Sequence, residues 1–260
     1  MKAAFGVVAQ AATLTLRAAR PAAGALLFTT IFGCSTETRA PATPAAAPAA
    51  PAAASSGVVG AASAPVTEQA PSELAATRVD PRKVPVPSAD APSRGPVDAP
   101  VTVQVFSDFE CPFCAMAAPV VRELEGEFGG SIRVVWRNLP LPMHPHAALA
   151  AVTGLEVYAE RGGAAFWRFH DSTFAAQRGG LDAKTLEKLA VDAGADPKRY
   201  HEALEKHVHD AKVQADLDAG DAAGINGTPA FFINSYFAVG ALPYPEMRAI
   251  VVQALREAKR

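Results

Sequence analysis

The alternation of apolar and polar positions predicts regular structure only after about residue 95. Segments 101–106 (VTVQVF) and 132–136 (IRVVW) carry β-branched residues with the spacing of buried strands. Between them, apolar residues recur at helical spacing, at Phe113, Ala117, Val120, Val121, Leu124 and Phe128. The order strand, helix, strand predicts a right-handed βαβ unit.

A long run of helical signal follows this unit. We expect helices over 145–159, 164–176, 182–193, 196–207 and 211–223. Asp196 followed by Pro197 is typical of a helix start, and Gly224 ends the last of these helices. Two strands and a final amphipathic helix complete the chain, at 230–233, 236–239 and 245–259. The order βαβ, helices, ββα predicts an α/β fold.

The N-terminal residues have the composition of a targeting segment. Lys2, Arg17 and Arg20 precede a short apolar stretch, 21–33, which ends beside Cys34. This order is typical of a secretory signal peptide, so we expect residues 1–33 to be removed. The sequence Ile-Phe-Gly-Cys at 31–34 resembles a bacterial lipobox, which predicts lipidation of Cys34 and attachment to a membrane surface. Ordinary secretion with an incidental cysteine is the alternative.

Residues 34–94 are rich in Ala, Pro, Ser and Thr, as in APATPAAAPAAPAAA at 40–54. Such a segment has few large apolar side chains to offset its ordering entropy, so we expect a disordered tether. A proline-rich ligand for another protein is the alternative, although no clear PxxP motif with flanking basic residues is present.

The charge distribution argues against nucleic acid as a partner. After residue 100 the chain has 16 Lys and Arg residues against 20 Asp and Glu residues, which gives a mildly acidic body without a basic stripe. No apolar run reaches the 18 or so residues of a membrane-spanning helix. We therefore expect contact with a membrane only through the lipid anchor.

Cys111 and Cys114 form a Cys-Pro-Phe-Cys motif where the first helix begins. Their spacing suits a disulfide, and unpaired N–H groups at a helix start favour thiolate over thiol. We therefore predict Cys111 as the exposed nucleophile and Cys114 as the more buried resolving thiol. An inert structural disulfide is the alternative, but a loop this short constrains the unfolded chain little.

Neighbouring carboxylates and histidines leave other interpretations open. Glu110 would raise the pKa of Cys111 if it faced the sulfur, but we expect it to be solvated. Asp108 is compatible with a proton relay to Cys114 or with a capping role, and we assign it to neither. A metal site would need His144 and His146, or His207 and His209, as further ligands, but their spacing matches no zinc motif. We expect surface histidines and no metal.

Three stretches together resemble the DsbA-like thiol:disulfide oxidoreductases. They are GPVDAPVTVQVFSDFECPFC at 95–114, LPLPMHPHA at 139–147 and GINGTPAFFIN at 224–234. The resemblance extends over residues 95–260 and implies a thioredoxin-like fold with an inserted α-helical domain at about 140–224. It also implies that Thr228 and Pro229 form a cis-proline loop facing the dithiol. Such a loop would offer the backbone of Thr228 to an extended substrate.

The active-site dipeptide differs from that of the strong oxidants of this family. They have Pro-His between the cysteines, whereas Pro112 and Phe113 stand here, and Phe113 offers no hydrogen-bond donor. The direction of electron flow is therefore open.

The resemblance implies an extracytoplasmic enzyme, located in the periplasm or cell envelope, that exchanges disulfides with cysteine-containing proteins. A second redox partner would regenerate the dithiol, and no cofactor is needed because the two cysteines are the redox group. A reductase or isomerase, and a non-catalytic envelope lipoprotein with a structural disulfide, are the alternatives.

Overall fold

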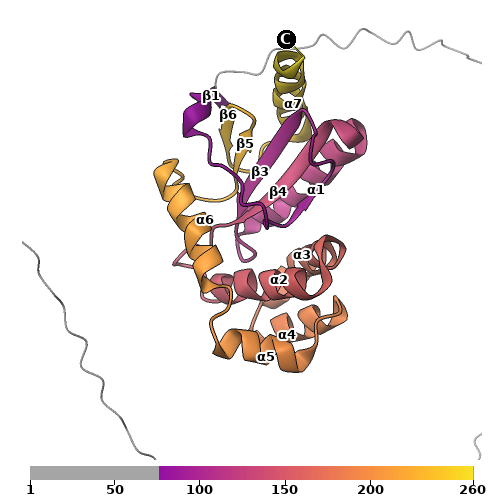
Figure 1. The fold of residues 1–260 in the computed structure, drawn as a ribbon, viewed down its shortest axis with the longest axis vertical. Coiled ribbons are helices and arrows are strands. Elements are labelled where there is room, and N and C mark those ends of the chain that lie inside the picture. The colour runs from indigo at the N-terminus through magenta and orange to yellow at the C-terminus, as the bar shows by residue number, and fades with distance from the viewer. Residues whose placement is uncertain (1–75, 260) are drawn as a thin grey trace, which may run out of the picture. The chain divides into compact units, whose positions relative to one another are not determined.

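The computed structural model describes residues 76–259, and Figure 1 shows how their elements are arranged. Within these residues the strands form one six-stranded sheet in the order β1-β6-β5-β3-β4-β2. Strands β3 and β4 are parallel, and every other pair is antiparallel. The strands are β1 (Thr77–Arg78), β2 (Ser93–Arg94), β3 (Val101–Ser107), β4 (Ile132–Asn138), β5 (Ala230–Ile233) and β6 (Tyr236–Val239).

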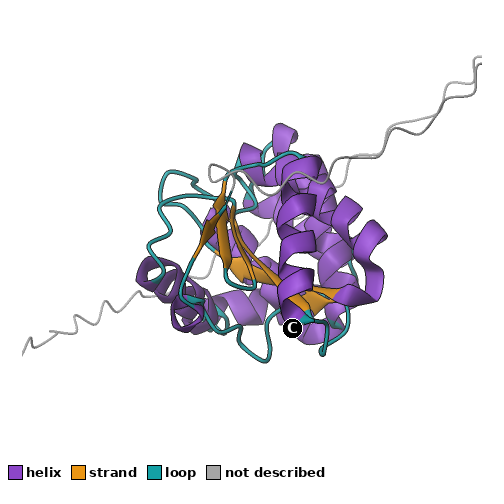
Figure 2. Ribbon diagram, turned by 90° about the horizontal axis from the view of Figure 1, so that it is seen from above, coloured by secondary structure: helices purple, strands orange, loops and turns teal. Residues whose placement is uncertain are grey.

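Helices cover both faces of this sheet (Figure 2). Helix α1 (Pro112–Phe128) connects β3 to β4, and α7 (Tyr244–Ala258) packs beside α1. The alternation along the strands explains the two layers, because successive strand side chains point to opposite faces. Val103 and Val105 belong to the core cluster with α1 and α7, whereas Phe106 belongs to a second cluster that α6 (Asp210–Ala222) covers.

The helical insertion lies between β4 and β5. Its first four helices are α2 (Ala147–Arg161), α3 (Gly163–Ala176), α4 (Ala183–Asp192) and α5 (Pro197–Glu205), and α6 returns the chain to the sheet. Two of the starts are capped by carboxylates: Asp182 accepts from Thr185 N at 2.8 Å, and Asp196 accepts from Arg199 N at 3.0 Å. The predicted element order and the helix start at Asp196 and Pro197 are therefore confirmed, and each predicted helix differs by a few residues at most.

The expected disordered tether is wrong over residues 76–94. There β1 pairs with β6 and β2 pairs with β4, so this arm occupies both edges of the sheet. A 3₁₀ turn, Pro81–Lys83, lies between the two strands. The physical reason is that exposed sheet edges offer unpaired backbone groups, which even a two-residue strand satisfies. The predicted signal peptide, Cys34 and the rest of the tether, 34–75, lie outside the described residues.

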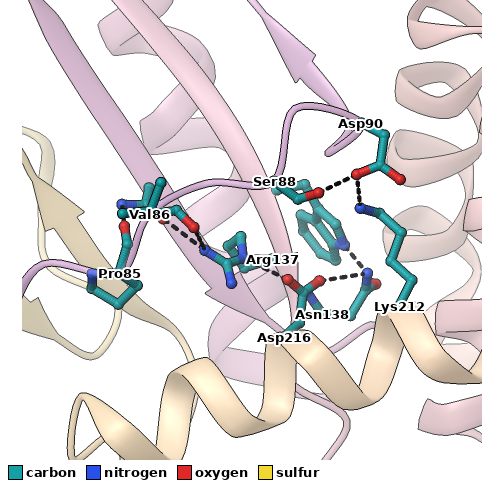
Figure 3. Close-up of polar contacts among 10 residues, drawn as sticks. Pro85, Val86, Ser88, Asp90, Arg137, Asn138, Lys212 and Asp216 are labelled. Atoms are coloured by element: carbon teal, nitrogen blue, oxygen red, sulfur yellow. Dashed lines mark hydrogen bonds and ion pairs between the residues drawn. The ribbon is translucent and has the colours of Figure 1, made fainter.

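A buried ion pair fastens α6 to the sheet (Figure 3). Arg137 Nε donates to Asp216 Oδ1 at 2.5 Å, and both side chains are about 95% buried, with 4% and 5% exposed. The other oxygen of Asp216 accepts from the backbone N–H of Asn138 at 2.9 Å. Arg137 also donates to the side chain of Gln104 and to the carbonyl of Val86 in the N-terminal arm. The sheet, α6 and the arm therefore share one polar network.

No helix among residues 76–259 has both the length and the apolar character needed to cross a membrane.

Candidate active site

Cys111 occupies the N-cap of α1, one loop beyond the end of β3. Its backbone N–H donates to Asp108 O at 3.1 Å, and its carbonyl accepts from Cys114 N at 3.1 Å. Pro112 follows at the first helical position, where the missing N–H costs nothing. Backbone N–H groups of Phe113 and Cys114 hydrogen-bond the Cys111 sulfur. The local sequence thus directs the positive end of the helix at one sulfur atom.

Cys111 and Cys114 are free thiols with opposite acidities. The pKa of Cys111 is lowered to about 5, chiefly because the Cys114 thiol hydrogen-bonds the Cys111 sulfur. Burial raises the pKa of Cys111, whereas Thr228 and the backbone N–H groups of α1 lower it further. Burial raises the pKa of Cys114, and its hydrogen bond to the Cys111 sulfur raises it further. Cys111 is therefore a thiolate at neutral pH, and Cys114 is a thiol.

The loop before β5 lies against the dithiol. The Thr228–Pro229 peptide bond is cis, as the resemblance implies. Cys111 Sγ lies 3.4 Å from the carbonyl oxygen of Thr228, and Pro229 is buried. The structure thus brings Thr228, Pro229 and both cysteines together.

The exposure of the motif differs from the prediction for Cys111. This residue is 3% exposed and Cys114 is 2% exposed, whereas Phe113 between them is 57% exposed. Cys111 was expected to be exposed because it starts a helix, but its sulfur lies against the Thr228 carbonyl from a segment more than a hundred residues later. Helix position alone therefore does not reveal how well a residue is covered.

Asp108 is an anchor for the loop that follows β4. Its carboxylate accepts three hydrogen bonds, from Glu110 N at 2.7 Å, from Leu141 N at 2.8 Å and from the His144 ring at 2.7 Å. Its own backbone N–H donates to Cys114 Sγ at 3.5 Å. Asp108 is therefore a structural link between the motif and the 139–146 loop, and sequence reasoning left this role open.

His144 places a titratable ring beside the dithiol. Burial lowers its pKa, but the hydrogen bond and charge of Asp108, together with the negative charge of Cys111, outweigh burial and leave the pKa raised. Its side chain is only 20% exposed, so the expectation of a surface histidine is wrong here. The LPLPMHPHA stretch contained this residue, but nothing in its spacing indicated contact with Asp108.

Glu110 faces the same loop. One of its oxygens accepts from the backbone N–H of His146 at 2.5 Å, and the other lies 3.2 Å from the His146 ring. Its side chain is 14% exposed, so the expected solvated position is wrong. Both oxygens of the Glu110 carboxylate contact His146, so Glu110 is held against this loop.

The histidines proposed as possible metal ligands pair with carboxylates instead. Among residues 76–259 no group of three or more His, Cys, Asp or Glu residues has the arrangement of a metal site. The pairs are His144 with Asp108, His146 with Glu110, His207 with Asp210 and His209 with Glu156.

Gln177 ties the insertion to the motif. It follows α3, and its side-chain amide donates to Phe109 O at 2.8 Å and to Cys111 O at 3.0 Å. Phe109 itself stacks on Trp136 with ring centroids 4.7 Å apart. Sequence reasoning missed Gln177, because a single glutamine at a helix end has no distinctive pattern.

The thioredoxin family model matches residues 88–253. Among curated relatives, the Na⁺/H⁺ antiporter NhaA 3 of Salinispora tropica is 40% identical over 167 residues, which cover 64% of this chain and 25% of the antiporter. The chain therefore spans about a quarter of the length of that relative.

Solved structures give a fuller match. BdbD from Bacillus subtilis is 27% identical with a TM-score of 0.60, and the alignment covers 65% of this chain and 96% of BdbD. The thiol-disulfide exchange protein alpha-DsbA2 from Wolbachia pipientis is 20% identical with a TM-score of 0.57, covering 64% and 88% of the two chains. The sheet order, the cis-proline loop beside the dithiol and the family match agree: this chain belongs to the thioredoxin family, in the DsbA-like form with a helical insertion.

Proposed function

We propose that this protein is an extracytoplasmic thiol:disulfide oxidoreductase that exchanges disulfides with protein cysteines through Cys111 and Cys114. One observation carries the proposal: a cysteine with a pKa of about 5 lies at a helix start, 3.4 Å from the carbonyl of Thr228. An inert disulfide has no need of a stabilised thiolate, whereas a reactive cysteine requires one.

The low pKa of Cys111 favours the oxidising direction. In the oxidised enzyme a client thiolate attacks Cys111 Sγ, the bond between Cys111 and Cys114 breaks, and Cys114 leaves and takes up a proton. A second client thiolate then attacks the client sulfur of the mixed disulfide and releases Cys111 as a thiolate. The client loses two electrons and the enzyme gains them. Because a thiol of low pKa is a good leaving group, the second step and the reduced state are both favoured.

The surface around the motif suits an extended, apolar client segment. Phe113, Met116 and Met143 are 57%, 61% and 76% exposed, and the loop that carries Met143 is fastened to Asp108. Exposed apolar side chains of this size mark contact surfaces, and the flexible methionines adapt to different partners. The Thr228 backbone would hold the client strand, as the resemblance implies. The proposed clients are cysteine-containing proteins that are not yet folded.

The enzyme needs a second partner and a compartment that permits disulfides. An oxidant must remove the two electrons from the reduced dithiol, and we propose another membrane or soluble redox protein in this role. The N-terminal sequence supports secretion, with attachment through Cys34. Antiport is not part of the proposal, because the NhaA relative matches over a quarter of its length only.

Two measurements test the proposal. Equilibration with glutathione should give a reduction potential nearer about −120 mV than about −270 mV, and a value at the reducing end would overturn the oxidising direction. The variant Cys114→Ala should accumulate mixed disulfides with secreted proteins in cells, because the resolving thiol is missing. The control, with Cys111 also changed to Ala, should accumulate none. Equal yields from both variants would show that Cys111 does not exchange.

The low exposure of Cys111 favours one other candidate function, a binding protein whose disulfide is structural. The two candidates differ in how the reduced protein reacts with iodoacetamide. If the protein is an oxidoreductase, the rate of Cys111 alkylation should rise with pH with an apparent pKa of about 5. A binding protein should react with an ordinary thiol pKa of about 8.5 or not react at all.

A further inference from the structure

A small cavity lies beside Cys114, between α1, the sheet and α3. Its volume is about 20 Å³, and it is lined by Cys114, Ser107, Pro229 and apolar groups of α1, together with Trp136, Trp167, His170 and Phe174. A space of this size holds one water molecule if polar partners are present.

Buried polar side chains line this cavity: Ser107, whose side chain hydrogen-bonds the Cys114 thiol, together with Trp167 and His170. Trp167 is 8% exposed, and its indole Nε1 is buried without a hydrogen-bond acceptor. His170 is 5% exposed, and its Nδ1 lies 2.9 Å from Asp171 Oδ1. Because a carboxylate only accepts hydrogen bonds, Nδ1 carries the proton and Nε2 of the neutral ring is an acceptor. The cavity thus combines an indole donor, an imidazole acceptor and the Cys114 thiol.

The Asp108 carboxylate does not contact Cys114. Both oxygens of Asp108 accept hydrogen bonds from Glu110, Leu141 and His144, and Asp108 contacts the Cys114 sulfur through its backbone N–H. Burial keeps Cys114 protonated, although it must become a thiolate to attack a mixed disulfide. The proton therefore needs another acceptor.

We propose that one water molecule in this cavity, together with His170, carries the proton between Cys114 and Asp171 at the surface. The inference deepens the proposed function and rests on it. As Cys114 attacks Cys111 in a mixed disulfide, the client thiolate leaves, and the Cys114 proton passes through the water to His170 Nε2. His170 then releases its Nδ1 proton toward Asp171, whose side chain is 34% exposed. When Cys114 leaves as a thiolate, the proton takes the reverse route.

The charges around His170 suit a relay. Asp171 is paired with Arg122 of α1 at 2.6 Å, and Arg94 of β2 lies over the Trp167 ring at 4.0 Å. Burial lowers the pKa of His170, the Asp171 carboxylate opposes this, and Arg94 and Arg122 lower the pKa further. The ring is therefore neutral at physiological pH and able to accept a proton. Aromatic rings of Trp136, Trp167 and Phe174 hold it in place, with centroids 4.9–5.0 Å away.

Stopped-flow reaction of the reduced protein with dithiobis(nitrobenzoate) separates the two thiol steps. Cys111 attacks first and releases one nitrothiobenzoate; Cys114 then resolves the mixed disulfide and releases the second. We expect His170→Gln to slow the second release by at least about tenfold, since positioned acid–base groups contribute about 10² to 10⁴. The first release should be unchanged. Trp167→Phe, which removes the donor to the water, should slow the second release as well.

Controls separate the relay from packing. Phe174→Leu alters the same cavity without removing a polar group, and it should leave the second release within about twofold of wild type. Asp171 is partly exposed, so the Asp171→Asn variant should fold even if His170→Gln does not. This variant should release the second nitrothiobenzoate more slowly, and the rate of that release should depend differently on pH. Wild-type rates in His170→Gln and Asp171→Asn would overturn the relay, whereas a wild-type protein with no second release would instead overturn the proposed function.

Discussion

Asp108 Oδ2 and His144 Nδ1 are 2.7 Å apart, and this contact joins the loop before the dithiol to the loop after β4. The negative charge of Cys111 helps to raise the pKa of His144, so the two groups interact. Phe113 supplies no cation, and we expect the charge of a protonated His144 to favour the Cys111 thiolate in return.

Changing His144 to Asn should therefore weaken the Cys111 thiolate. The side chain of Asn can still donate to Asp108, but it carries no charge. We expect the apparent pKa of Cys111 to rise from about 5. Iodoacetamide alkylation near pH 5.5 should become about twofold slower, because about 1 kcal/mol of charge interaction raises the pKa by about 0.7 and lowers the thiolate fraction from about 0.8 to about 0.4. His146→Asn is the matched control, because His146 pairs with Glu110. An equal effect of both variants would show that charge at His144 is not the cause.

The stability of the reduced protein should depend on pH through Cys111. Its folded pKa of about 5 lies below the ordinary value of about 8.5, so the unfolded chain binds more protons between these pH values. The free energy of unfolding should therefore rise from about pH 5 to about pH 8.5, and this gain is lost as pH falls through the folded pKa.

Guanidinium unfolding at several pH values, in the presence and absence of a phosphine reductant, measures this effect. The oxidised protein is the control, because its two sulfurs do not titrate. The unfolding free energy of the reduced protein minus that of the oxidised protein should increase from about pH 5 to about pH 8.5. A constant difference would contradict the lowered pKa of Cys111.

Gln177 should stabilise the motif from the side of the insertion. Replacing it with Ala removes the donors to the carbonyls of Phe109 and Cys111. We expect a loss of about 1–2 kcal/mol in unfolding free energy, since each hydrogen bond contributes about 1 kcal/mol. Gln214→Ala, which removes an exposed contact to Asp218 on α6, should cost less than about 0.5 kcal/mol. Similar losses from the two variants would rule out a special role for Gln177.

Local patterns predicted most of the fold, because strands and helices here follow their apolar periodicity. Residues 230–233 alternate between two core clusters, every second residue of 101–105 belongs to one of them, and each expected helix has an apolar face or a capping residue. The arm at 76–94 was missed because its two-residue strands have no periodicity of their own. Pairing with β4 and β6 decides their structure, and such partners are distant in sequence.

Of the candidate site, too, only the part that local motifs encode was predictable from the sequence. The cysteine pair and the Thr228–Pro229 loop were recognisable from motifs. The contacts of Asp108, Glu110 and Gln177 were not, because each depends on a loop or helix end that the fold brings near. The burial of Cys111 has the same origin, since the covering carbonyl belongs to Thr228.

The ion pair between Arg137 and Asp216 should be the most sensitive polar contact outside the dithiol. Asp216→Ala leaves the guanidinium buried without its carboxylate, which typically costs about 3–5 kcal/mol. The double variant, Arg137→Met with Asp216→Leu, removes both charges and should be less destabilised than Asp216→Ala alone. Asp218→Ala, on the exposed side of the same helix, should stay within about 0.5 kcal/mol of wild type. Urea unfolding of the four proteins gives the comparison. If Asp216→Ala and Asp218→Ala lose equal stability, the buried pair does not fasten α6 to the sheet.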